Sequence, residues 1–153
     1  MPNAGLDAAA NSLRAWLNRQ HFSDLTSIET TRFFTDSITQ WAQSLGYNAR
    51  EEVHLPTESE ETRSRRLDLQ LRHRSKTGRL ISIEIDRTSK ALSLDKLTQA
   101  AELGDLALWV RWSRDPISVP IPPGIRVIRA HVLRRKSRTG GPIRMSLQAD
   151  SCG

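Results

Sequence analysis

The clearest pattern in the chain is a pair of alternating apolar and polar runs separated by a short basic segment. Three leucines alternate with polar residues over 67–71, and three isoleucines do the same over 81–86. Alternation of this kind predicts half-buried β-strands, in which every second side chain faces the same side. Gly78, in the intervening HRSKTG, can adopt the backbone conformation of a tight turn. The two runs are therefore predicted to form a β-hairpin centred near Lys76.

Apolar residues at helical spacing predict further elements on either side of this hairpin. A helix is predicted over about residues 6–20, and a second over 24–45, where Thr26 and Glu29 form a capping-box pattern. Ser93 is a predicted N-cap for a third helix. Strands are predicted at 47–55, at the nearly continuous apolar run 106–112 and at 125–133.

The order of these elements predicts an α/β fold, a sheet with helical flanks. A chain of 153 residues is long enough for one core, so residues 1–138 are predicted to be a single domain. Its parts are the N-terminal helix at about 6–20 and a core at about 24–133. Apolar periodicity is lost from Arg134 onward, and residues 139–153 are predicted to be a flexible tail.

Charge and cysteine content narrow the class of protein. The formal net charge of +6 makes polyanions plausible partners, although a basic protein with no nucleic-acid role fits the charge equally well. Cys152 is the single cysteine, so the chain can form neither an internal disulfide nor a cysteine zinc site. No apolar run reaches membrane-spanning length, and no apolar signal segment opens the chain. We therefore expect a cytoplasmic protein without a membrane partner.

Acidic side chains gather on one face of the predicted hairpin. Asp68 faces away from the leucines, and Glu84 and Asp86 face away from the isoleucines. In a hairpin centred near Lys76, Asp68 lies across from Glu84. Like charges in this arrangement are destabilising unless something offsets them, and a divalent cation such as Mg²⁺ would do so. The alternative is a solvated face whose acids pair with neighbouring arginines.

The succession of helix, three-stranded meander, helix and strand resembles the PD-(D/E)xK nuclease superfamily, the restriction-endonuclease-like fold. The resemblance covers about Thr26 to Val132, with Asp68 in RRLDLQL and Glu84 in ISIEIDR as the matching motif residues. It implies hydrolysis of phosphodiester bonds in DNA with Mg²⁺, for which Mn²⁺ would substitute. The implied metal ligands are Asp68, Glu84 and, on the preceding helix, Glu29. Enzymes of this fold that cut both strands often dimerise, so the resemblance leaves room for a homodimer.

One position departs from the family pattern. Asp86 stands where these enzymes usually carry the catalytic lysine. Asp86 could act as a ligand or general base, or the positive charge could come from Lys90, which we prefer, or from Lys96. The third alternative is a catalytically inactive DNA-binding or recruitment module on the same fold.

Basic residues surround this acidic motif and recur near the end of the predicted core. Lysine and arginine side chains neutralise phosphates on either side of a cut, so DNA is the expected partner. For the last two residues of the set, an ordinary solubilising role fits the sequence equally well. The predicted nucleic-acid-binding residues are Arg65, Arg66, Arg87, Lys96, Arg134 and Arg135.

Overall fold

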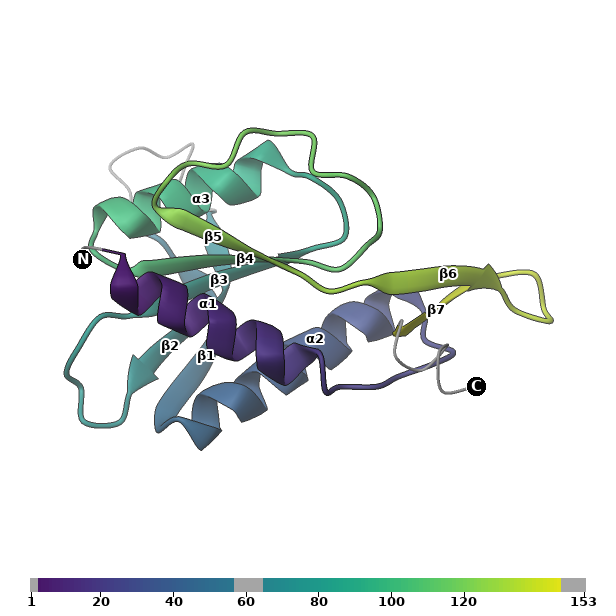
Figure 1. Ribbon diagram of the computed structural model, residues 1–153, viewed down its shortest axis with the longest axis horizontal. Helices are drawn as coiled ribbons and strands as arrows, with labels where there is room; N and C mark the ends of the chain where they lie inside the picture. Colours follow the sequence, from purple (N-terminus) through teal and green to yellow (C-terminus); the bar gives the residue numbers. More distant parts are fainter. Residues whose placement is uncertain (1–2, 57–64, 147–153) are drawn as a thin grey trace.

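The structure is a computed structural model that describes residues 3–56 and 65–146. Within this part of the chain, a five-stranded mixed sheet carries three helices, and a two-stranded hairpin follows it (Figure 1). The predicted α/β class is therefore confirmed. In chain order the elements are α1 Ala4–Leu17, α2 Ser27–Ser44, β1 Tyr47–His54, β2 Arg66–His73, β3 Ile81–Asp86, α3 Ala91–Glu102, β4 Leu106–Arg111, β5 Ile125–Arg129, β6 Val132–Lys136 and β7 Pro142–Ser146.

The strands of the large sheet lie in sequence order from β1 to β5. β1, β2 and β3 form an antiparallel meander, whereas β3, β4 and β5 run parallel. Leu69 lies opposite Ile83, a register that centres the β2–β3 hairpin on Lys76, as the sequence predicts. Parallel neighbours need a crossover connection, and α3 provides it between β3 and β4.

Two apolar cores lie on opposite faces of this sheet. The larger one packs α1 and α2 against the isoleucines of β3, and the smaller one packs α3 against Trp109 of β4. β3 and β4 are buried along their whole length, as the near-continuous apolar run of β4 predicts. Leu67 joins the smaller core, whereas Leu69 and Leu71 join the larger one. The alternation predicts that all three leucines face one side of the strand, but Leu67, at the beginning of β2, packs into a different core from Leu69 and Leu71.

The first residues of α2 and α3 test the N-cap predictions. Thr26 is the N-cap of α2, and its hydroxyl accepts a hydrogen bond from the Glu29 N–H at 3.2 Å, which confirms the capping box. Asp24 adopts a positive φ of 60° and lies outside the helix, so the predicted start is three residues too early. α3 begins at Ala91 with Lys90 as N-cap, and Ser93 lies inside it. The predicted Ser93 cap is therefore wrong.

The C-terminal part of the described chain differs most from prediction. The predicted last strand over 125–133 is interrupted after Arg129, and the segment from Val132 onward pairs with β7. An antiparallel bridge between Leu25 and Arg144 ties this hairpin to the segment before α2, and the hairpin projects beyond the end of the sheet (Figure 1).

Residues 142–146, which belong to the predicted flexible tail, form a strand, and so do residues 134–136, where apolar periodicity is lost. The hairpin escapes sequence-based detection because the exposed end of β6 is charged, and because Val132 and Met145 are its only buried apolar residues among those described. Residues 147–153 of the predicted tail lie outside the described residues. None of the helices in the described ranges combines the length and apolar character that crossing a membrane requires.

Candidate functional site

Asp68 and Glu84 meet at the point where the pairing between β2 and β3 ends. The last paired residues are Leu69 and Ile83, and the same register places Asp68 opposite Glu84. The Asp68 N–H donates to Glu84 Oε2 at 2.9 Å, and the Ile85 N–H donates to Asp68 Oδ2 at 2.8 Å. Each carboxylate thus bonds the backbone of the neighbouring strand and takes the place of a ladder hydrogen bond. This geometry fixes both side chains at one end of the sheet.

Lys96 of α3 completes this pair with a positive charge. Its ammonium group forms an ion pair with Glu84 Oε1 and donates to the Arg66 carbonyl at 2.9 Å. The Lys96 side chain is 14% exposed and that of Glu84 is 1% exposed. Lys96 was predicted to contact DNA from the surface, but the structure places it against the floor of the site.

Burial and charge shift the proton affinity of Glu84. Removal from water and, next, the nearby Asp68 carboxylate raise the pKa of Glu84, Lys96 acts in the opposite direction, and the net pKa is about 8. The Glu84 carboxyl therefore holds its proton to a higher pH than an ordinary glutamate does, even beside Lys96. A cation bound at this carboxylate would compete with that proton and bind more tightly as the pH rises.

This shift predicts a pH-dependent stability. The pKa of Glu84 rises from an ordinary 4.5 to about 8 on folding, so the folded state holds more protons in that interval and stability falls as pH increases through it. Glu84→Gln removes the titrating group, so it should lack the loss of stability, roughly 3 kcal/mol, that the wild type shows between pH 5 and pH 8. Urea unfolding at pH 5 and pH 8 measures the difference. Parallel pH profiles for the two proteins would contradict the assignment.

Asp86 lies on the same strand but has different partners. Its Oδ2 accepts a hydrogen bond from the Trp109 indole N–H at 2.9 Å, and its Oδ1 lies 3.6 Å from the Lys90 ammonium group. The Asp86 side chain is buried, whereas that of Lys90 is 61% exposed. Asp86 therefore anchors Trp109 in the smaller core, and Lys90 reaches it from the solvent side.

One cavity of about 430 Å³ joins these groups. Asp68 and Glu84 line it from the sheet, Lys90 and Lys96 from the segment around the start of α3, and Thr31 from α2. Asp86 and Arg87 also line it. The structure thus brings together all four predicted catalytic residues around a single cleft.

Glu29 does not belong to this cleft. Its carboxylate accepts a hydrogen bond from the Thr26 N–H at 2.9 Å in the capping box, and hydrogen bonds from Thr26 lower its pKa. Ser27 and Thr31 of the same helix line the cavity, whereas Glu29 does not. The predicted role of Glu29 as a metal ligand is therefore unsupported by its position.

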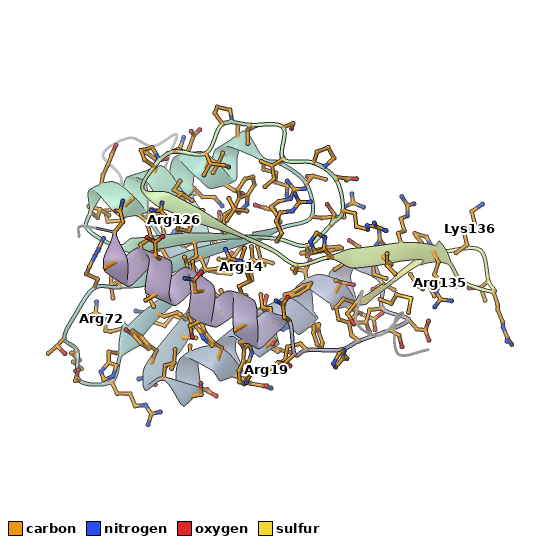
Figure 2. All side chains as sticks on the ribbon, viewed as in Figure 1. Arg14, Arg19, Arg72, Arg126, Arg135 and Lys136 are labelled. Carbon is orange, nitrogen blue, oxygen red and sulfur yellow. The ribbon has the colours of Figure 1, made fainter. Side chains whose placement is uncertain are left out.

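The predicted DNA-binding arginines are distributed over several surfaces. Arg66 is exposed at the start of β2, and Arg65 is half-buried just before it. Arg87 lies at the cleft, and Arg134 lines a second cavity. Arg135 instead directs its guanidinium to the Met145 sulfur at 2.9 Å. Figure 2 shows Arg135 and Lys136 on the projecting hairpin, and Arg14, Arg19 and Arg126 along and beside α1.

The fit of a metal ion depends on Asp68 and Glu84. In residues 3–56 and 65–146, no group of three or more His, Cys, Asp or Glu side chains is arranged to hold a metal. Mg²⁺ in nucleotide-processing sites is commonly held by one or two carboxylates, with water and substrate phosphate oxygens as the remaining ligands. Asp68 keeps one oxygen without a backbone hydrogen bond from the described residues, whereas the second oxygen of Glu84 is ion-paired with Lys96. A two-carboxylate Mg²⁺ site here therefore requires the cation to share that Glu84 oxygen with the Lys96 ammonium group.

Comparisons with protein-family models, curated proteins and solved structures find no match for this chain. The likeness to the PD-(D/E)xK superfamily therefore stays a prediction. It depends on Asp68, on Glu84 and on the order of the elements around them. DNA and a second copy of the chain likewise stay predicted partners.

Proposed function

We propose that this protein is a metal-dependent nuclease that hydrolyses phosphodiester bonds in DNA on a restriction-endonuclease-like core. The observation that carries the proposal is the meeting of Asp68 and Glu84 at the diverging ends of β2 and β3, with Lys96 at Glu84. Two carboxylates and a largely buried lysine around one cleft suit the chemistry of a negatively charged phosphate and an attacking water.

Each residue has a distinct part in this proposal. Asp68 and Glu84 would hold Mg²⁺, which when bound supplies Lewis-acid stabilisation of the phosphate and a more acidic water. Lys96 favours the ionised form of Glu84 and places a positive charge at the cleft floor. Lys90 and Arg87 at the cleft would neutralise phosphates of the strand. In enzymes of this superfamily a catalytic lysine usually stands at the position of Asp86. We propose that Lys96, rather than Lys90, supplies that positive charge here.

A second candidate function is supported by the partners of the acids. Asp86 stands at the usual lysine position and is occupied by Trp109 and Lys90. Glu84 has a pKa of about 8 because of its burial and the Asp68 charge, which weakens cation binding at neutral pH. These features favour a catalytically inactive module that binds DNA through its basic residues.

Metal-dependent cleavage separates the two candidates. Supercoiled plasmid and linear duplex should be cut by the wild type with Mg²⁺ or Mn²⁺, and EDTA should abolish the cleavage. A labelled duplex in EDTA should bind and lose affinity steeply between about 50 and 200 mM salt, because each neutralised phosphate releases counterions. Salt-sensitive binding without cleavage in either metal would establish the inactive module. The absence of both would refute both candidates.

A further inference from the structure

A second cavity, of about 420 Å³, lies beside the acidic cleft. Arg87, Thr88 and Trp112 line both cavities, so the two are neighbouring parts of one surface. The far wall of the second cavity comes from the β6–β7 hairpin through Arg134 and Arg144. A strand of nucleic acid with one phosphate at the carboxylates could thus extend directly into this cavity.

Arg144 is the most unusual residue of this cavity. It is 5% exposed, and its backbone exchanges hydrogen bonds of 2.7 and 3.0 Å with Leu25, which fixes its position. Its guanidinium forms no hydrogen bond or ion pair within the described part of the chain. A buried cation without a partner is costly, so this position favours an anion that is supplied from outside the chain.

Trp112 provides a second unsatisfied donor at the same place. Its ring is buried and stacks on Phe34 at a centroid distance of 6.3 Å. Its indole N–H is buried and has no acceptor among the residues that the structure describes. Buried indole N–H groups normally have an acceptor, so a residue of the cavity lining carries an unsatisfied donor close to the unpaired guanidinium group of Arg144.

The charge balance of the cavity identifies the kind of ligand. Arg87, Arg114, Arg134 and Arg144 line it, and Asp115 is the acidic residue among its lining. The pKa of Arg144 is lowered by its burial and then by repulsion from Arg87 and Arg134. Guanidinium groups bind phosphate oxygens through paired hydrogen bonds, so the arrangement suits a compact anion with several acceptor oxygens.

We propose that this cavity binds a phosphate group of the strand whose neighbouring phosphodiester lies at Asp68 and Glu84. The excess of arginines over acids favours the doubly charged phosphate at a strand end over the singly charged phosphodiester within a strand. The identity of the ligand as a nucleic-acid phosphate rests on the proposed function. The protein would accordingly act at or close to phosphorylated ends of DNA.

The test compares short duplexes that differ only at their ends. Fluorescence anisotropy in EDTA measures affinity for duplexes with a 5′-phosphate, a 3′-phosphate or hydroxyl groups at both ends. We expect the duplex with one of the two phosphorylated ends to bind about tenfold more tightly than the duplex with hydroxyl ends. The added phosphate gains about one hydrogen bond between charged groups, which accounts for a difference of this size. Arg134→Glu and Arg144→Met should abolish this preference. Arg135→Glu makes the same charge change one residue away, outside the cavity, and should retain it.

Each outcome decides a part of the proposal. If Arg134→Glu weakens binding far more than Arg135→Glu but all ends bind alike, the cavity holds an internal phosphate and the end preference is wrong. Equal effects of the two variants would refute the phosphate site. Inorganic phosphate should also raise the melting temperature of the wild type above sodium chloride at equal ionic strength, and Arg134→Glu should remove this effect. Because no metal is present, these results are independent of whether the protein cleaves DNA.

Discussion

Asp68→Asn and Glu84→Gln should each lower the rate of Mg²⁺-dependent DNA cleavage by about 10³-fold, a loss of about 4 kcal/mol of transition-state stabilisation. Both substitutions preserve size and the ability to accept a hydrogen bond. The contacts to the Asp68 and Ile85 N–H groups can therefore persist. What is lost is the negative charge that would hold the metal ion. A plasmid-nicking time course at saturating Mg²⁺ measures the rates.

A matched control lies on the same strand. Gln70→Ala changes a half-buried polar residue of β2 that faces Ser82 across the hairpin and does not line the cleft, so its cleavage rate should equal that of the wild type. Far-ultraviolet circular dichroism verifies that all variants fold. Wild-type cleavage by both folded carboxylate variants would eliminate the proposed metal site.

Lys96→Met should lower the cleavage rate by roughly 10²–10³-fold, the cost of removing one preorganised positive group from an active site. Lys90→Met should change it by less than about fivefold, because an exposed ion pair contributes little. Lys96 is largely buried and contacts Glu84, whereas Lys90 is mostly exposed and lies 3.6 Å from Asp86. Cleavage assays on the two variants, which make the same change of residue type, compare the positions directly.

The pH profile of Lys96→Met gives a second measurement. Lys96 lowers the pKa of Glu84, so its loss should shift the rise of the cleavage rate to higher pH. A variant that merely loosens the fold would lower the rate without moving the profile. Full activity of Lys96→Met together with loss of activity in Lys90→Met would restore the interpretation that the sequence favoured.

Local signals explain the parts of the fold that the sequence predicts well. The alternation of leucines and isoleucines gives the β2–β3 hairpin and its centre at Lys76, because side-chain direction in a strand has a period of two. The capping box of α2 is similarly local, since Thr26 and Glu29 are three residues apart and interact through the backbone between them. The same register brings Asp68 opposite Glu84.

Other features involve partners that are distant in the chain. The pairing of β6 with β7 is not predicted, because the charged side chains at the exposed end of β6 give no apolar alternation. In the sequence, Lys96 looks like a solvent-exposed helix residue. Which side of α3 contacts the sheet depends on how the crossover packs, and no local pattern shows this. In the sequence, Glu29 stands where a metal ligand is expected. In the structure, its carboxylate instead accepts the capping hydrogen bond from Thr26.

The sequence by itself determined the α/β class, the acid-bearing hairpin and the pair Asp68 and Glu84, because these follow from short-range periodicity and register. Only the tertiary structure decided three features. Lys96 forms an ion pair with Glu84, and Asp86 accepts a hydrogen bond from Trp109. Arg144 lies buried without an acidic partner among the described residues. Burial, ion pairing and pKa depend on groups that folding brings together from distant parts of the chain, and no local pattern encodes those neighbours.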